Sequence, residues 1–295
     1  MSNNRGVALI TGAAQGIGRA VALWLAEDGF DVAVNDVSSK SENLDTLVEE
    51  IQKKGRASSK HIADISQDQQ VQTLVEEVVK NHGNLDVMVA NAAILGPEVP
   101  FIENISRLSY TVIDLSYCRN WDQVLAANAR GPFLCYKYAG IQMIKQGHGG
   151  RIIGTCSLAG KQGTEFALGS HNHAQSVHWP PVELGAHQIT VNAVAPGAVD
   201  TPMREESTVH GEKLEQIKQA SPLKRIGPVI FYPSHPENNL TKHRLPEDIA
   251  GLVSFLASKE SQFITGQTVG GHGLLNCGRS YFPTQISING GLFFD

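Results

Sequence analysis

The fold is decided by residues 7–18, Val-Ala-Leu-Ile-Thr-Gly-Ala-Ala-Gln-Gly-Ile-Gly. Residues 7–10 form a short apolar run, typical of a buried parallel strand, and residues 20–28 follow the glycines with a helical pattern. Strand, glycine-rich turn and helix therefore occur in the order that binds a dinucleotide, with the start of the helix facing the phosphates. Loops and helix ends also collect glycine, so the motif gains weight only from the sequence around it.

The glycines of this turn have separate physical roles. Gly12 permits the tight turn, Gly16 lets the backbone approach a diphosphate, and Gly18 lets the helix pack against the strand. The residues of the turn that we predict to bind the cofactor are Gly12, Gln15, Gly16, Ile17 and Gly18.

A second strand is predicted over Asp31–Asp36, and it ends in a carboxylate. A carboxylate at this position can accept hydrogen bonds from both hydroxyl groups of a ribose, and it repels the 2′-phosphate of NADP(H). Asp36 therefore predicts NAD(H) as the cofactor. The alternative is that Asp36 only begins a surface loop.

Strands and helices continue to alternate after this unit. A helix is predicted at 42–54, followed by the segment 61–64, a helix at 68–81 and a strand at 85–89. This order predicts an α/β fold of the Rossmann type, with a doubly wound parallel sheet. The chain has 295 residues, of which 41% are hydrophobic, and nothing in it resembles a linker, so residues 1–295 are expected to form a single domain.

The overall charge and the cysteines disfavour several classes of partner. The formal net charge is −5 and the isoelectric point is about 6.1, so charge gives no reason to expect nucleic acid or an anionic membrane. The sequence shows no export signal and no apolar run of spanning length, and we expect a soluble, cytoplasmic protein. The four cysteines lack the paired spacing of a zinc site, and no metal site is predicted.

Further motifs follow in a definite order: residues 11–18, Asp64, Asn91-Ala-Ala93, Asn128-Ala-Arg-Gly131, residues 150–160 and residues 191–197. Together they resemble the classical short-chain dehydrogenase/reductase family, in pieces that cover nearly the whole chain. Within that family, Gly147-His-Gly-Gly150 and the ending Gly291-Leu-Phe-Phe-Asp295 look most like diacetyl/acetoin reductases and 2,3-butanediol dehydrogenases. The resemblance implies an NAD(H)-dependent oxidoreductase acting on a small hydroxyketone, diketone or alcohol, such as acetoin or diacetyl.

The resemblance also implies roles for single residues. Asn128 resembles the residue that holds a water in a proton relay, and Ser157 resembles the one that hydrogen-bonds the substrate carbonyl, so these two are the candidate catalytic residues. Taken in isolation, such residues are ordinary turn, helix or strand-end residues. The residues that would lie against the cofactor are Asp64 at the adenine, Asn91 and Ala92 at the adenosine, and Pro196, Gly197, Val199 and Thr201 at the nicotinamide.

The chain departs from the family at the catalytic acid. In the family a tyrosine follows the serine on a long helix, and a lysine one helical turn further lowers its pKa. None of the six tyrosines here has a lysine four residues on, and the corresponding positions hold Ser170 and Ala174. Prolines at 180 and 181 cannot sit inside that helix. The sequence therefore predicts impaired catalysis, and the alternative function is that of a non-catalytic NAD-binding protein.

Four atypical segments interrupt the family pattern, at 108–120, 170–182, 228–244 and 269–285. One hypothesis is an aberrantly spliced gene product, in which 170–182 reflects a shifted splice site or reading frame and the other three are retained introns. The other hypothesis is genuine lineage-specific loops. His171, His173 and His178 are expected in a solvated loop rather than as proton donors or metal ligands. The resemblance implies a homotetramer, but it would use surfaces that these segments alter.

Overall fold

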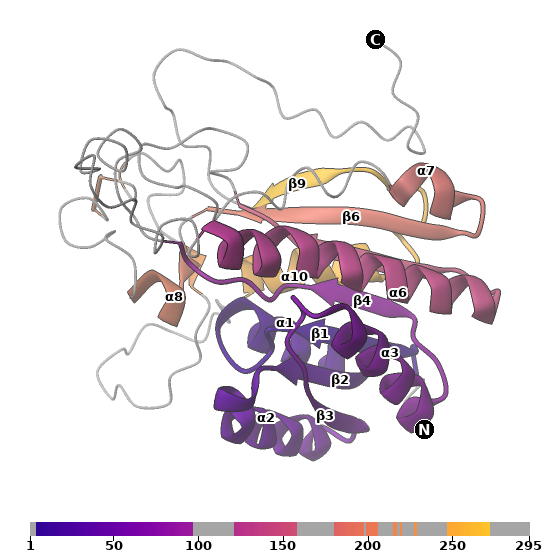
Figure 1. The fold of residues 1–295 in the computed structure, drawn as a ribbon, viewed down its shortest axis with the longest axis horizontal. Coiled ribbons are helices and arrows are strands. Elements are labelled where there is room, and N and C mark those ends of the chain that lie inside the picture. The colour runs from indigo at the N-terminus through magenta and orange to yellow at the C-terminus, as the bar shows by residue number, and fades with distance from the viewer. Residues whose placement is uncertain are drawn as a thin grey trace, which may run out of the picture.

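A seven-stranded parallel sheet lies between two layers of helices (Figure 1). The computed structural model describes residues 4–96, 121–157, 180–197, 199–205, 215–216, 219, 227–228 and 247–271. The strand order across the sheet is β3-β2-β1-β4-β5-β6-β9. The strands are β1 (Val7–Thr11), β2 (Asp31–Asp36), β3 (Ser58–Ile62), β4 (Val87–Ala90), β5 (Gly150–Thr155), β6 (Ile189–Pro196) and β9 (Thr268–Gly271). A separate pair joins β7 (Val199–Asp200) to β8 (Gly227–Pro228).

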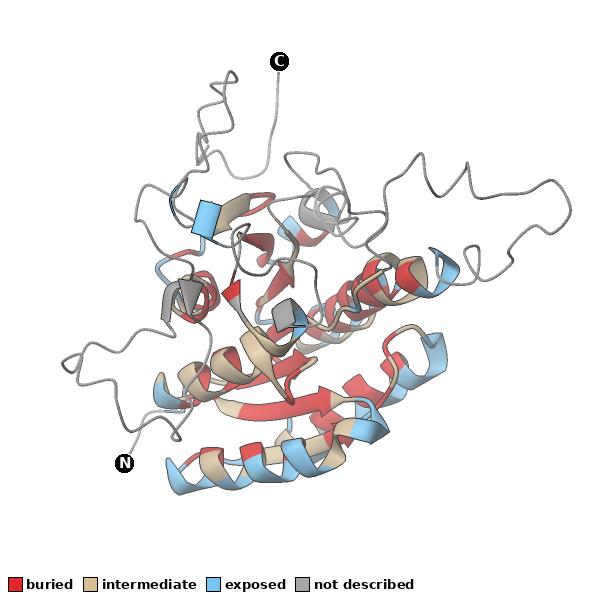
Figure 2. Ribbon diagram, turned by 90° about the vertical axis from the view of Figure 1, so that its left-hand side faces the viewer, coloured by how far each residue is buried: buried red, intermediate tan, exposed pale blue. Residues whose placement is uncertain are grey.

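The helices divide between the two faces of the sheet. Helices α1, α2 and α10 enclose one buried apolar cluster, and α3, α6 and α7 enclose the other. Figure 2 shows the strands largely buried and the helices exposed on their outer sides. Among the described residues, no helix is long and apolar enough to cross a membrane. The helices are α1 (Gly16–Glu27), α2 (Ser41–Lys53), α3 (Asp68–His82), α6 (Gly131–Gln146), α7 (Pro180–Gly185), α8 (Pro202–Glu205) and α10 (Glu247–Ala257), with short turns η1 (Ser38–Lys40) and η2 (Ala126–Arg130).

The doubly wound α/β sheet of a single domain is confirmed. Strand β2 has the predicted bounds, and the strand predicted at 7–10 is present as β1. The helices predicted at 20–28, 42–54 and 68–81 are present as α1, α2 and α3. Helix α1 begins at Gly16, earlier than the predicted start at residue 20, because the last glycines of the turn already belong to its first turn. Strand β3 begins at Ser58 and ends at Ile62, so the predicted segment 61–64 runs from the strand into the following turn.

Three of the atypical segments touch described elements, since Pro228, the first residue of 228–244, belongs to β8. Pro180 and Pro181 are the first two residues of α7, where a missing backbone N–H leaves no hydrogen bond unmade. Residues 269–271 belong to β9, in which Val269 pairs with Val194 of β6. Residues 108–120 and the greater part of the other three segments lie outside the described residues, and so do the three histidines.

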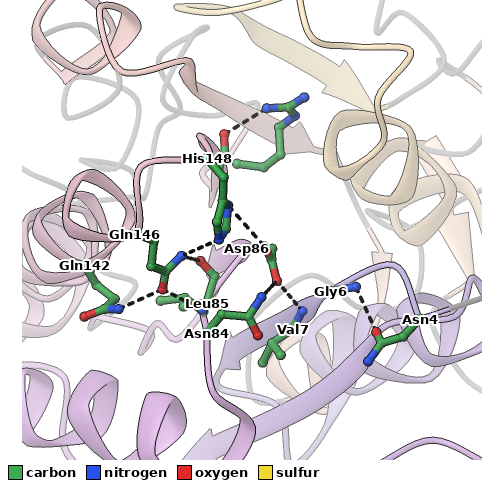
Figure 3. Close-up of polar contacts among 11 residues, drawn as sticks. Asn4, Gly6, Val7, Asn84, Leu85, Asp86, Gln142, Gln146 and His148 are labelled. Atoms are coloured by element: carbon green, nitrogen blue, oxygen red, sulfur yellow. Dashed lines mark hydrogen bonds and ion pairs between the residues drawn. The ribbon is translucent and has the colours of Figure 1, made fainter.

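A polar network ties the sheet together at the end where β1, β4 and β5 begin (Figure 3). The backbone N–H of Val7 and the amide of Asn84 both donate to Oδ2 of Asp86, each at 2.7 Å. His148 lies on the other side, with Nδ1 3.7 Å from Oδ1. Burial raises the pKa of Asp86, while the hydrogen bond from Val7 and the neighbouring His148 oppose that shift. This network is structural, since it lies at the opposite ends of the strands from the predicted cofactor residues.

Candidate cofactor and active site

The site predicted from the sequence lies at the carboxyl ends of the central strands. Strands β1 and β4 are parallel neighbours in the sheet. Going along the chain, the strands before β4 extend the sheet to one side of β1, and those from β4 onward extend it to the other side, so the order reverses between β1 and β4. In open parallel sheets, ligands bind outside the carboxyl ends of the strands at such a reversal. The glycine turn follows β1, Asn91 follows β4, and Ser157 follows β5, so the topology brings these segments to one edge.

The glycine turn is so closely packed at Gly12 and Gly18 that neither position has room for a side chain. Gly12 has a φ of +64°, and a methyl group added to it would lie 2.7 Å from Cα of Ala92. A methyl group at Gly18 would collide with the carbonyl oxygen of Gly12 and lie 2.6 Å from Nδ2 of Asn91. The glycines thus let β1, α1 and the segment after β4 approach one another.

Asn91 and Ala92 are held against this turn by hydrogen bonds. The backbone N–H groups of Asn91 and Ala92 donate to Oγ1 of Thr11 at 3.1 and 3.2 Å. The amide Nδ2 of Asn91 donates to the carbonyl oxygens of Thr11 and Gly12, at 3.1 and 3.2 Å. Asn91 therefore supports the shape of the turn through its side chain, whatever it contributes to the cofactor.

The start of α1 is arranged to receive an anion. Gln15 is the N-terminal cap residue, its side chain makes no capping hydrogen bond, and the first turn of the helix contains no acidic residue. The first N–H groups of a helix have no intrahelical acceptor, and the helix dipole favours negative charge there. A dinucleotide diphosphate fits this end of α1, because Gly16 presents backbone rather than side chain there.

Asp36 lies at the end of β2, directly beside the glycine turn. Its Oδ2 accepts the backbone N–H of Ala14 at 3.1 Å, and its Oδ1 accepts that of Val37 at 2.9 Å. The carboxylate is half-buried, and each oxygen keeps a further lone pair for a ribose hydroxyl. The same turn carries Lys40, whose Nζ donates to Oε1 of Gln15 at 2.9 Å.

Asp64 occupies the turn between β3 and α3. Its Oδ1 accepts the backbone N–H of Ser66 at 2.9 Å, and its own N–H donates to Oε1 of Gln70 at 2.8 Å. The neighbouring Ala63 donates its N–H to the carbonyl oxygen of Asp36 at 3.2 Å. The predicted adenine and ribose residues thus lie on adjacent strand ends.

Asn128 is fully buried in the π-helical turn η2. Its amide pairs with the backbone N–H and C=O of one residue, since Oδ1 accepts the N–H of Ile94 at 2.9 Å and Nδ2 donates to the carbonyl oxygen of Ile94 at 2.8 Å. One amide hydrogen and one lone pair remain for a water. The helix after the fourth strand is present as predicted, while the pairing with Ile94 was not foreseen.

Ser157 follows β5 and is half-buried, as is the preceding Cys156. The thiol of Cys156 donates to the carbonyl oxygen of Val194 on β6 at 3.2 Å, which holds the end of β5 against that strand. Of the residues predicted to lie against the nicotinamide, Pro196 ends β6, Gly197 follows it, and Val199 lies in β7. Thr201 follows the end of β7. A methyl group added at Gly16 would lie 3.5 Å from Cγ2 of Thr201, so the glycine turn and the segment after β6 are adjacent.

Two residues of the site were not among the predicted ones, namely Thr11 and Lys40. Thr11 is fully buried and organises Asn91 and Ala92 through its hydroxyl. The sequence could have indicated Thr11, because its hydroxyl group stands at the end of an otherwise apolar strand. Lys40 comes four residues after Asp36 in the sequence. The short helical turn η1 places its side chain next to Gln15. In the described ranges, no group of three or more His, Cys, Asp or Glu side chains could hold a metal ion.

Comparison with known proteins agrees with this geometry. The family model described as short chain dehydrogenase matches residues 6–211. A short-chain dehydrogenase/reductase of Armillaria gallica is 39% identical over 298 residues, covering 98% of this chain and 96% of the relative. Another, from Hericium erinaceus, is 41% identical over 271 residues and covers 90% and 95%.

Solved structures share the fold at lower identity. Levodione reductase is 28% identical with a TM-score of 0.76, covering 92% of this chain and 97% of that one. Xylitol dehydrogenase bound to NAD⁺ is 26% identical with a TM-score of 0.75, covering 92% and 98%. Acetoin dehydrogenase from Salmonella typhimurium is 29% identical with a TM-score of 0.72, covering 94% and 98%.

Proposed function

The chain belongs to the short-chain dehydrogenase/reductase family, and from this premise we propose that it is an NAD(H)-dependent oxidoreductase of small hydroxyketones, diketones or alcohols. The observation that carries the cofactor assignment is Asp36, half-buried beside the glycine turn with lone pairs left for a ribose. A similar protein, xylitol dehydrogenase, has been solved with NAD⁺ bound. The substrate class is supported by the similarity to acetoin dehydrogenase and by the Gly147-His-Gly-Gly150 motif.

The protein's part of the chemistry is to orient the carbonyl and to supply a proton. A bound nicotinamide supplies the hydride. Ser157, at the end of β5, can donate a hydrogen bond to the substrate carbonyl, and Asn128 can hold a water with its remaining amide hydrogen. Neither group is a proton donor matched to neutral pH, which is what general acid catalysis requires.

We infer that turnover is low, because the sequence contains no tyrosine with a lysine four residues on. Loss of a positioned acid costs roughly 10²- to 10⁴-fold in rate. The same observation favours a second candidate, a protein that binds NAD(H) without reducing a substrate. Both candidates share the cofactor site and differ only in whether the hydride is transferred.

An assay of the purified full chain with NADH and diacetyl separates the two candidates. Loss of the nicotinamide absorbance, at a rate well below that of an acetoin dehydrogenase, supports the enzyme. Binding of NADH without any loss of absorbance supports the binding protein. Failure to bind either NADH or NADPH would contradict both.

The cofactor assignment makes a prediction for Asp36. NADH should bind more tightly than NADPH, and Asp36→Ala should narrow the gap, because the change removes both a ribose acceptor and a repulsive charge. Fluorescence titration of the reduced cofactors measures the two dissociation constants. Asp64→Ala is the matched control, and it should affect both cofactors alike, since the adenine is common to them. Equal affinities in the unmodified chain would defeat the assignment.

A further inference from the structure

Strand β3 and helix α3 bring a serine, a histidine and a carboxylate into line, outside the cofactor site. Ser59 and His61 are two residues apart on β3, so their side chains point to the same face of the sheet. Oγ of Ser59 lies 2.8 Å from Nε2 of His61, and Nδ1 of His61 lies 3.1 Å from Oε2 of Glu77 on α3. A nucleophile, a base and a third group that orients the base form the arrangement that activates a serine.

The hydrogen atoms of these groups have one consistent placement. A carboxylate accepts but does not donate, so a neutral His61 carries its hydrogen on Nδ1 and leaves Nε2 as an acceptor. Nε2 of His82 lies 2.7 Å from Oγ of Ser59 and can donate to it. The hydroxyl hydrogen of Ser59 then points to His61, which is the direction that general base catalysis requires.

The base is enclosed, while the serine can be reached. The ring of His61 is 3% exposed, so packing fixes its position, and both of its nitrogens have partners. Ser59 is half-buried, and β3 is the outermost strand of the sheet (Figure 1). No other strand of the described ranges covers the outer edge of β3, so a small molecule can approach the hydroxyl of Ser59 from that side.

The free edge of β3 also supplies a backbone donor. The N–H of Val32 on β2 donates to the carbonyl oxygen of Ala57, and in a parallel pair only alternate residues of a strand bond to the same neighbour. Ser59 therefore bonds to β2, and the N–H of Lys60 points to the free edge. The N–H of the residue after a nucleophilic serine is a usual donor to the oxyanion that forms in acyl transfer.

We propose that Ser59 is the nucleophile of a second reactive site, which hydrolyses small activated esters. Oγ of Ser59 bonds to the carbonyl carbon of the ester while its hydrogen passes to Nε2 of His61. The bond from that carbon to the alcohol oxygen then breaks, and the alcohol leaves with the proton. Water repeats both steps on the acyl-serine, which releases the carboxylic acid and restores the hydroxyl. Glu77 is a positioning residue, because it acts through His61, and no step involves a dinucleotide.

The test uses p-nitrophenyl acetate and the full chain without a cofactor. Absorbance follows the release of p-nitrophenolate, and peptide mass spectrometry of briefly treated protein identifies the acetylated residue. The variants are Ser59→Ala and Glu77→Gln, with Ser58→Ala and Glu76→Gln as matched controls. Ser58 is also half-buried on β3, but its hydroxyl donates to a backbone carbonyl oxygen of β2, and Glu76 is the exposed neighbour of Glu77.

The unmodified chain should carry the acetyl group on Ser59. Ser59→Ala should lower the rate of p-nitrophenolate release by on the order of 10²-fold, because the nucleophile is gone. Glu77→Gln should lower kcat roughly tenfold and change KM by less than about twofold, because Glu77 orients the base without touching the ester. Both control variants should behave like the unmodified chain.

Two results would overturn the inference. One is an acetyl group found only on lysines or on residues other than Ser59 in the unmodified chain, and this result does not depend on whether any variant folds. The other is p-nitrophenolate release that Ser59→Ala leaves unchanged. Either result leaves the proposed function standing, because NADH binding is measured separately and uses none of these residues.

Discussion

Thr11 shows how one hydroxyl organises the candidate site. It ends β1, is fully buried, and its Oγ1 accepts the N–H groups of Asn91 and Ala92. The same hydroxyl is 3.4 Å from the carbonyl oxygen of Val89, to which it donates. Thr11 thereby connects the ends of β1 and β4 at the reversal of the sheet, and no apolar residue of the same size could do so.

Thr11→Val should destabilise the protein and weaken cofactor binding together. Valine keeps the shape but leaves two N–H groups without their acceptor, which costs about 1–3 kcal/mol. For a chain of this size each kcal/mol lowers the melting temperature by roughly 2–4 °C. Thermal unfolding and NADH titration measure the two effects.

Thr11→Ser is the control for this change, because serine retains the hydroxyl and loses only a methyl group. It should keep most of the NADH affinity that valine loses. If valine and serine variants bind NADH equally well, the hydroxyl does not shape the cofactor site.

At the scale of elements, β3 and α3 are joined by a directed hydrogen-bond relay. Nδ1 of His61 lies 3.1 Å from the carboxylate of Glu77, and Nε2 lies 2.8 Å from Oγ of Ser59. Nε2 of His82 is 2.7 Å from the same hydroxyl. A carboxylate only accepts, so a neutral His61 donates to Glu77 and accepts from Ser59, which in turn accepts from His82. A hollow lined by His61, Thr73 and Glu77 lies beside this relay.

This relay predicts that acid weakens the docking of α3 on β3. Burial lowers the pKa of His82, as does the neighbouring His61, while the Asp31 carboxylate opposes the shift. A histidine whose folded pKa lies below its unfolded value contributes stability above about pH 6.5, and that stability is lost as the pH falls further, because the unfolded chain takes up the proton first. The melting temperature should therefore fall between pH 7 and pH 5.5.

His82→Gln should reduce this fall, since glutamine can still donate to Ser59 and does not titrate. Exposed His187 supplies the control, and His187→Gln should leave the pH dependence as it is. A His82→Gln variant whose melting temperature falls as steeply as that of the unmodified chain would show that the relay is not the titrating element.

At the scale of the whole molecule, the chain lacks both the family's catalytic tyrosine and the long helix that would carry it. Helix α7 is six residues long and begins at Pro180. It packs on α6, where Leu184 lies against Gly140. A proline disfavours helical backbone in the residue before it, so α7 does not extend readily toward Ser170. The position that corresponds to the family's tyrosine lies outside the described residues.

Replacing residues 170–182 with a helical segment that carries Tyr-x-x-x-Lys, and deleting 108–120, 229–244 and 272–285, should raise diacetyl reduction by on the order of 10²-fold or more. The last two deletions start at 229 and 272, because Pro228 belongs to β8 and residues 269–271 belong to β9. Ser170→Tyr with Ala174→Lys alone should recover little, since Pro180 and Pro181 remain. Steady-state rates with NADH measure both variants.

A fully active unmodified chain would contradict this prediction, and loss of that activity in His171→Ala or His173→Ala would make a histidine the acid. Sequencing the mature transcript addresses the origin of the segments. A message that encodes all four segments would rule out retained introns and leave lineage-specific loops.

The sequence by itself determined the class of fold and the order of the elements around the glycine turn. Residues 7–18 and the strand ending at Asp36 predict a strand, a glycine turn, a helix and a second strand that ends in a carboxylate, and these are found in that order. These features are local, because hydrophobic periodicity and glycine spacing act between residues close in the chain. The family motifs identified Asn128 and Ser157 as candidate catalytic residues, but they did not predict which residues these two contact.

Only the tertiary structure decided the strand order and the contacts between distant residues. The reversal between β1 and β4, the pairing of Asn128 with Ile94 and the reach of Lys40 to Gln15 each join segments that no periodicity relates. Such contacts depend on how the helices pack on each face of the sheet, and a hydrogen bond forms only where packing brings donor and acceptor within about 3 Å. The residue types at the candidate site were therefore readable from the sequence, while the contacts between them were decided by packing.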